Sequence, residues 1–194
     1  MTDPQKAVPP QRQTIPTLRT ARLVLRPFRA DDGPAVQRLA GDPEIATTTL
    51  NIPHPYPDGV AEKWIAGHAE ACAGGKGLSL AVTLAASGEL IGAISLMSIS
   101  SAHSHAELGY WIGKDFWGRG YCTEAAREIV RFAFEEMGLH RVFGHHFSRN
   151  PASGRVMQKI GMRHEGTHPQ HIRKWEEFED VESYGVLKSD LREA

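Results

Sequence analysis

The chain has 194 residues, of which 41% are hydrophobic and 23% charged, and its formal net charge at pH 7 is only −1. That balance argues against nucleic acid or an anionic membrane as the main partner. No apolar stretch is long enough for a transmembrane helix, and the first residues lack a signal-peptide pattern, so we expect a cytoplasmic protein. Two cysteines, Cys72 and Cys122, are too few for a disulfide framework and fit a reducing compartment.

One globular domain is expected over residues 20–188, which is long enough for a complete hydrophobic core. Residues 1–19 carry four prolines among polar neighbours and are predicted to form a flexible leader. Residues 189–194 are expected to form a short tail.

Alternating apolar residues predict a first strand over 22–28, and helical periodicity predicts helices over 31–40 and 58–73. Between these helices, residues 47–57 are rich in proline and are expected to be neither helix nor central strand. The later elements are expected to be a hairpin of strands 78–84 and 90–99, a strand over 106–113, a helix ending near Met137, a strand over 141–147, a helix over 150–160, and strands near 162–166 and 180–187. This order predicts a mixed α/β layer.

The most informative stretch is Trp117-Gly118-Arg119-Gly120-Tyr121-Cys122-Thr123-Glu124-Ala125, between strand 106–113 and the following helix. The first amides of a helix lack intrahelical partners and carry the positive end of its dipole, so they favour anions. Gly118 and Gly120 let the backbone approach a ligand closely. The stretch lacks the lysine of a P-loop and the third glycine of a dinucleotide fingerprint. It predicts a pyrophosphate cradle of another kind, and the alternative is a turn whose glycines serve geometry alone.

Three ordered motifs resemble the GNAT superfamily of acetyltransferases, in particular its RimJ/RimL branch. Gly120 meets the acyl-CoA signature Gln/Arg-x-x-Gly-x-Gly/Ala, in which Trp117 and Cys122 replace the first and last residues. The other two motifs are residues 20–28 and the pair of segments 150–153 and 159–162. The resemblance covers residues 20–188 and implies the GNAT fold: a seven-stranded, mixed, largely antiparallel sheet, splayed between its fourth and fifth strands and flanked by about four helices.

The resemblance implies an acetyl-CoA-dependent N-acetyltransferase in which a primary amine attacks the thioester directly within a ternary complex. Acetyl-CoA is then the cosubstrate, and no metal is needed. The acceptor is either a protein N-terminal α-amine or a small amine. A non-catalytic acyl-CoA-binding or sensing module is the alternative, and exposed sheet edges would allow a homodimer.

The same resemblance assigns residues to the cosubstrate. Main-chain contacts to pantetheine fall on Tyr110, Trp111, Ile112 and Gly113. The cradle would consist of Trp117, Gly118, Arg119, Gly120, Tyr121, Cys122 and Thr123. Asn150 is expected to contact pantetheine through its amide, and Ser153 to face CoA.

Two residues are candidates for proton transfer. Glu107 lies where some superfamily members carry a catalytic base, and its apolar neighbours would raise the pKa of its carboxyl group; it could instead pair with Arg119 or Arg141. Ser153 would protonate the departing thiolate, or it belongs with Asn150 to an ordinary helix N-terminal turn.

The remaining reactive side chains are interpreted structurally. The histidines and cysteines form no metal-binding pattern, so no metal site is expected. His146 is a candidate proton relay, although a solvated strand histidine is favoured. Cys122, at a helix start, would have a lowered thiol pKa, but a small residue at a crowded turn is favoured over a nucleophile.

Acceptor specificity is expected in residues 50–57 and in the loop 168–179 between the last two strands. This loop leads into an acidic run that could attract a cationic amine or peptide: Glu176, Glu177, Glu179 and Asp180. Arg173 and Lys174 partly neutralise the run, which favours an ordinary solvated face.

Overall fold

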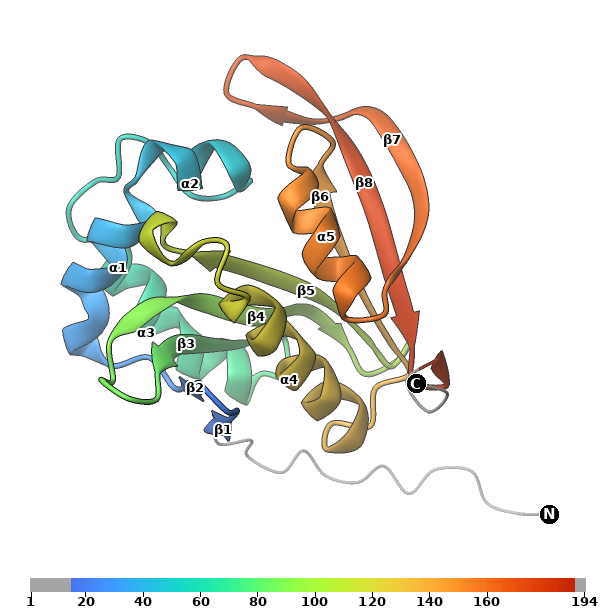
Figure 1. The fold of residues 1–194 in the computed structure, drawn as a ribbon, viewed down its shortest axis with the longest axis horizontal. Coiled ribbons are helices and arrows are strands. Elements are labelled where there is room, and N and C mark those ends of the chain that lie inside the picture. Colours follow the sequence, from blue (N-terminus) through green and yellow to red (C-terminus); the bar gives the residue numbers. More distant parts are fainter. Residues whose placement is uncertain (1–14, 191–194) are drawn as a thin grey trace.

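The computed structural model describes residues 15–190, and Figure 1 shows helices packed around one sheet of eight strands. The strands lie in the order β1-β2-β3-β4-β5-β6-β8-β7. They are β1 (Leu18–Arg19), β2 (Leu23–Arg26), β3 (Leu78–Leu84), β4 (Leu90–Ser100), β5 (His105–Ile112), β6 (Arg141–Phe147), β7 (Arg163–Lys174) and β8 (Glu177–Leu187). The α-helices are α1 (Gly33–Ala40), α2 (Pro43–Thr48), α3 (Val60–Ala73), α4 (Tyr121–Glu135) and α5 (Pro151–Lys159). The predicted mixed α/β class is confirmed.

The sheet has one strand more than predicted, because Leu18 and Arg19 pair with β2 in a short antiparallel ladder. Leu18 is buried, and Ile15 packs against the hydrophobic core. The packed chain therefore begins before the expected boundary at residue 20. Residues 1–14 of the expected leader and 191–194 of the expected tail lie outside the described residues.

Helix α2 reaches into the segment 47–57, which was expected to contain no helix. Asp42 caps it by accepting a hydrogen bond from the amide of Glu44 at 2.8 Å, and Pro43 occupies the first turn, where its missing N–H is not needed. The Gly41-Asp42-Pro43 stretch therefore ends α1 and also begins a second helix. The prolines follow α2, and the chain is irregular from there to α3.

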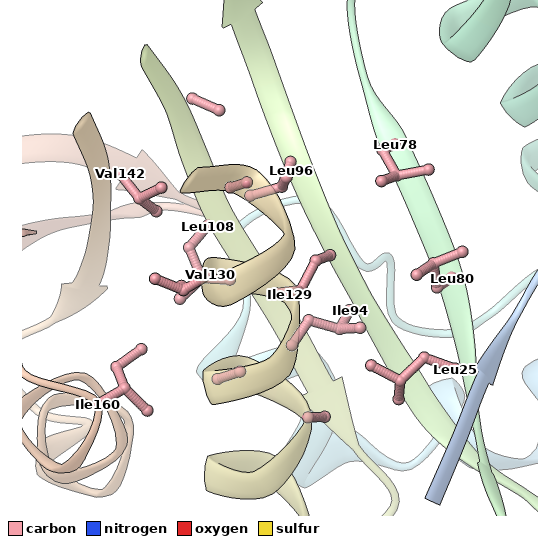
Figure 2. Close-up of a cluster of buried hydrophobic side chains, with 14 of the residues drawn as sticks. Leu25, Leu78, Leu80, Ile94, Leu96, Leu108, Ile129, Val130, Val142 and Ile160 are labelled. Carbon is pink, nitrogen blue, oxygen red and sulfur yellow. The ribbon is translucent and has the colours of Figure 1, made fainter. Parts of the chain in front are cut away.

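Helices cover both faces of the sheet. On one face, Ile129 and Val130 of α4 belong to one hydrophobic cluster with strand residues that include Leu80 (Figure 2). On the other face, α1 and α3 pack over a cluster that includes Ala81. Leu80 and Ala81 are neighbours on β3, and successive strand residues point to opposite faces. The part of the sheet around β3 is therefore buried between two layers of helices.

The sheet divides between β5 and β6. These strands run parallel and pair only from His105↔Arg141 to Glu107↔Phe143. Beyond Glu107, β5 continues with β4 alone, whereas β6 continues with β8. Since β1 is the added strand, this division is the predicted splay between the fourth and fifth strands, and that prediction is confirmed.

β7 and β8 form one long hairpin, and the predicted loop over 168–179 is wrong. β7 extends to Lys174 and β8 begins at Glu177, so only Trp175 and Glu176 separate them. In Figure 1 the hairpin, in orange and red, projects beyond the rest of the sheet. Most β7 residues are exposed polar or charged groups, which hide the alternation that identifies a strand in a sequence.

Candidate active site

A cavity of about 890 Å³ lies at the division of the sheet. Its lining includes Glu107 and Trp111 from one face of β5 and Tyr110 and Ile112 from the other. The cavity therefore extends through the sheet. It is bordered by the start of α4, by α5, and by an opposite group of residues from 48–53 and the β7–β8 hairpin.

The glycine turn lies at one border of this cavity. A single 3-10 turn (Lys114–Phe116) leads into it, and Gly118 and Gly120 have φ values of 73° and 80°, which glycine adopts without steric cost. Gly120 is the N-cap of α4 and has no side chain with which to bond the first amides. The indole Nε1 of Trp117 donates to the carbonyl of Ile112 at 2.5 Å and holds the turn against the end of β5. Residues 120–123 line the cavity, which leaves their amides available to an anion there.

Residues from the N-terminal motif hold the start of α4. The Arg22 guanidinium donates to Glu124 Oε2 at 2.6 Å and to the carbonyl of Arg119 at 3.0 Å, and it lies 4.6 Å from the ring centre of Tyr121. Thr20 Oγ1 donates to Glu124 Oε1 at 2.6 Å. Burial raises the pKa of Glu124, but the hydrogen bonds from Thr20 and Arg22 outweigh burial and keep that pKa below its usual value. Two motifs that are distant in the sequence thus form one structure, the Arg22–Glu124 latch.

Three exposed basic side chains lie beside the turn or the cavity. Arg119 belongs to the turn, and Arg155 and Lys159 are one turn apart on α5 and line the cavity. Within residues 15–190, none of the three pairs with a carboxylate. Free backbone amides at α4, unpaired cations and an open β5 edge fit a ligand that carries phosphates and a long polar arm.

The phenol of Tyr110 and the hydroxyl of Ser153 meet across the cavity. The two oxygens are 2.9 Å apart, and the phenol also donates to the Ser153 carbonyl at 3.0 Å. Burial raises the pKa of Tyr110. Sequence reasoning assigned Tyr110 a main-chain role and missed its side chain, because nothing in the sequence brings β5 next to α5.

Asn150 serves as the N-cap of α5. Its Oδ1 accepts a hydrogen bond from the amide of Ser153 at 3.3 Å, and its Nδ2 donates to the carbonyl of Thr48 at 3.4 Å. The helix N-terminal turn proposed for Asn150 and Ser153 is therefore present. Both residues also line the cavity.

Glu107 lies on the opposite face of β5 from Tyr110. Its Oε1 is 3.3 Å from Nδ1 of His145, two residues beyond its β6 partner Phe143. The alternative pairing with an arginine is wrong: Arg141 pairs with Glu165, and Arg119 makes no ion pair within the described chain. The side chain of Glu107 is 28% exposed.

Two further expectations are corrected. Burial raises the pKa of the Cys122 thiol to about 12, so the lowered pKa expected at a helix start is not found. His146 is buried rather than solvated, and it stacks on Tyr184. Its Nε2 has no hydrogen-bond partner in the described part of the chain and faces Gly154.

The border of the cavity opposite the turn is largely neutral. It includes residues 48–53, together with His171, Ile172 and Val181. The acidic run does not line it: Glu176 pairs with Arg173, Glu179 pairs with Arg149, and Asp180 accepts from the amide of Gln170.

Among residues 15–190, no group of three or more His, Cys, Asp or Glu side chains is placed to hold a metal ion. In the same part of the chain, no helix is both long enough and apolar enough to cross a membrane.

The sequence pattern of the acetyltransferase (GNAT) domain family matches residues 22–163, and the chain belongs to this family. It is an acetyl-CoA-dependent acetyltransferase.

Its relatives agree in length and in fold. The uncharacterized N-acetyltransferase YnaD of Bacillus subtilis is 31% identical over 172 residues, which are 88% of this chain and 96% of YnaD. The structure of a GNAT acetyltransferase from Bacillus anthracis is 26% identical, covers 89% of this chain and 99% of its own, and has a TM-score of 0.79. The fold is also that of RimL, a ribosomal L7/L12 α-N-protein acetyltransferase solved with coenzyme A, at 19% identity and a TM-score of 0.80 over 89% of this chain and 97% of RimL. The predicted family is confirmed.

Proposed function

We propose that the enzyme acetylates a primary amine that carries a single positive charge, either a protein N-terminal α-amine or a small monoamine, with residues 20–188 as its catalytic domain. The observation that carries this proposal is the charge of the cavity. Within the described chain, Glu107 is the one carboxylate among its lining residues.

The donor half of the site is formed by backbone and basic groups. Within residues 15–190, the edge of β5 that faces β6 has no strand partner beyond Glu107, which suits main-chain contacts from Tyr110, Trp111, Ile112 and Gly113 to a pantetheine arm. The uncapped amides at the start of α4 suit a pyrophosphate, and Arg119, Arg155 and Lys159 add positive charge nearby. The residues proposed for the cradle are Trp117, Gly118, Arg119, Gly120, Tyr121, Cys122 and Thr123.

Proton transfer would use groups on the two faces of β5. Bound acetyl-CoA supplies an activated thioester and a sulfur leaving group. Glu107 accepts the proton of the incoming ammonium group and passes it to solvent through the partly exposed His145. On the other face, the Ser153 hydroxyl, positioned by the Tyr110 phenol, donates a proton to the departing sulfur as the C–S bond breaks, and it regains a proton from the amine nitrogen, which loses its second proton as the amide forms.

We call the neutral border of the cavity opposite the glycine turn the acceptor border; it consists of residues 48–53, His171, Ile172 and Val181. Its lack of charge limits the charge of the acceptor. A polyamine would place a second ammonium group among Thr48, Leu50 and Ile52, and among the described lining residues no carboxylate other than Glu107 is present to compensate it. An α-amine has a pKa near ~8, so about a tenth of it is already neutral at pH 7 and one modest base is sufficient.

The test is an acetylation assay with peptides that begin in Ala, Ser or Met, with small monoamines, and with spermidine and an aminoglycoside. We expect turnover of monocationic acceptors and at least about tenfold lower kcat/KM for the polycations. Glu107→Gln should lower kcat/KM by about 100-fold at pH 7, and by less at pH 9, where more of the amine is neutral. Glu89→Gln, in the exposed β3–β4 turn, is the matched control.

Preferred turnover of spermidine would contradict the acceptor class. Binding of acetyl-CoA with no turnover of any acceptor would instead favour a non-catalytic acyl-CoA-binding module. An unchanged rate for Glu107→Gln at pH 7 would remove Glu107 from its role as base.

A further inference from the structure

Lys174 is a buried cation without a carboxylate partner in the described chain. It is the last residue of β7, and only 5% of its surface is exposed. Its Nζ donates to the carbonyls of Leu50 at 2.9 Å and Ile52 at 3.1 Å. Burying an ammonium group is costly, and two carbonyl acceptors offset part of that cost.

The two segments that this contact joins both contribute residues to the acceptor border of the cavity. Leu50 and Ile52 line it from the irregular segment between α2 and α3, and His171 and Ile172 line it from β7. The contact joins segments that are 122 and 124 residues apart in the chain. At the end of α2, Thr49 Oγ1 donates to the carbonyl of Ile45 at 2.8 Å, and Asn150 Nδ2 donates to the carbonyl of Thr48 at 3.4 Å.

Burial is the main cause that lowers the pKa of Lys174, and the nearby Arg149 lowers it further. The ring of Trp175, 4.8 Å from Nζ, covers the ammonium group. A methionine in this position would keep the apolar stem and pack as well, but it would lose both carbonyl bonds. The two carbonyl bonds and the contact of the ammonium group with the Trp175 ring are therefore what the lysine adds beyond its volume.

We propose that Lys174 is a positioning residue that fixes residues 50–52 against the β7–β8 hairpin and so sets the width of the acceptor border. This proposal rests on the proposed function, because it assigns that border to the amine. It predicts an effect on acceptor binding that is separate from donor binding.

The test compares Lys174→Met with Lys174→Arg and with Lys63→Met, an exposed lysine on α3 that does not line the cavity. For Lys174→Met we expect the acceptor KM to rise about tenfold, while kcat and the KM for acetyl-CoA stay within about twofold. Lys174→Arg keeps a buried donor and should recover part of the loss. Lys63→Met should behave as wild type.

Hydrogen exchange provides a second readout that does not depend on activity. Amides of residues 49–53 should exchange faster in Lys174→Met than in wild type, and those of β5 should not. If the methionine variant does not fold, Lys174→Gln, which keeps a shorter donor, should show the same pattern. An unchanged acceptor KM together with unchanged exchange at 49–53 would overturn the proposal, as would an equal rise in both KM values. If wild type acetylates no amine, the proposed function fails, and faster exchange at 49–53 would still support the contact.

Discussion

Gly120 combines two requirements in one residue. Its φ of 80° lies in the left-handed region, and it is the N-cap from which α4 begins beside the cavity. Among the described residues, a Cβ there would meet only the Arg22 guanidinium, at 3.5 Å, an ordinary contact. The constraint on this position is therefore the backbone conformation and the approach of a ligand, rather than crowding by the protein itself.

Gly120→Val should weaken acetyl-CoA binding by at least about tenfold, because a β-branched residue disfavours this conformation and shields the first amides of α4. Gly88→Val is the matched control: Gly88 has a φ of 75°, no described atom lies within 4 Å of an added Cβ, and it belongs to the β3–β4 turn, which does not line the cavity. Both variants should lose stability through the same strain, and calorimetric titration should show an affinity loss in Gly120→Val alone. Equal affinities in the two folded variants would refute the cradle.

At the scale of single residues, the sequence predicts a residue's role where that role depends on the local backbone geometry. The roles of the glycines and the Asn150 cap follow from neighbours in the chain, whereas Glu107 was assigned from the family resemblance. The partners did not follow from it: Tyr110 with Ser153, and Glu107 with His145, are contacts between elements. The burial of Cys122 is likewise a property of the packed core, and it outweighs the helix start that would have lowered the thiol pKa.

At the scale of elements, α4 is held at its start by the Arg22–Glu124 latch and along its length by packing on the sheet. A donor to the carbonyl of Arg119 restrains the turn just before Gly120. The N-terminal motif therefore contacts the half of the site that we propose for acetyl-CoA, although none of its residues is among the described lining residues of the cavity.

Arg22→Met should weaken acetyl-CoA binding about fivefold, the equivalent of one hydrogen bond worth about 1 kcal/mol. Arg131→Met is the control, since Arg131 makes ion pairs with Glu128 and Glu135 on the outer surface of the same helix. Titration with acetyl-CoA should leave the Arg131 variant unchanged. If both variants bind equally well, the latch has no part in shaping the turn.

Elements with strong periodicity were predicted within a few residues, among them α3, β3 and β6. The errors fall where polar residues form regular structure. β7 is an edge strand with exposed side chains on both faces, so its sequence resembles a loop. α2 is too short for a helical period to be visible, and its only local signal, Asp42-Pro43, also marks the end of α1.

At the scale of the whole molecule, a buried histidine links folding to pH. His68 of α3 packs between Phe28 and Trp64, with ring centres 5.1 and 4.4 Å away, and neither ring nitrogen has a hydrogen-bond partner within residues 15–190. Burial lowers the pKa of His68 from 6.5 to about 4. Between those values the unfolded chain binds the proton more readily, so acidification favours unfolding.

The contribution of neutral His68 to the free energy of unfolding should therefore be fully present above pH 6.5. The free energy of unfolding should fall by roughly 3 kcal/mol as the pH is lowered through 4. His68→Phe keeps the ring contacts and should remove most of this dependence, as measured by urea denaturation between pH 7 and 4. His103→Phe, at an exposed histidine, should leave the pH dependence intact. A wild-type curve that is flat over this interval would show that His68 titrates normally.

The short parallel pairing of β5 and β6 has a consequence for the stability of the folded enzyme. The two halves of the sheet share only the positions from His105 to Glu107, so a molecule seated in the gap would touch both halves at once. By mass action, a ligand present at a hundredfold its dissociation constant adds about 2.7 kcal/mol to the folded state. A low concentration of acetyl-CoA would then slow the reaction and would also make the enzyme itself more susceptible to unfolding and proteolysis.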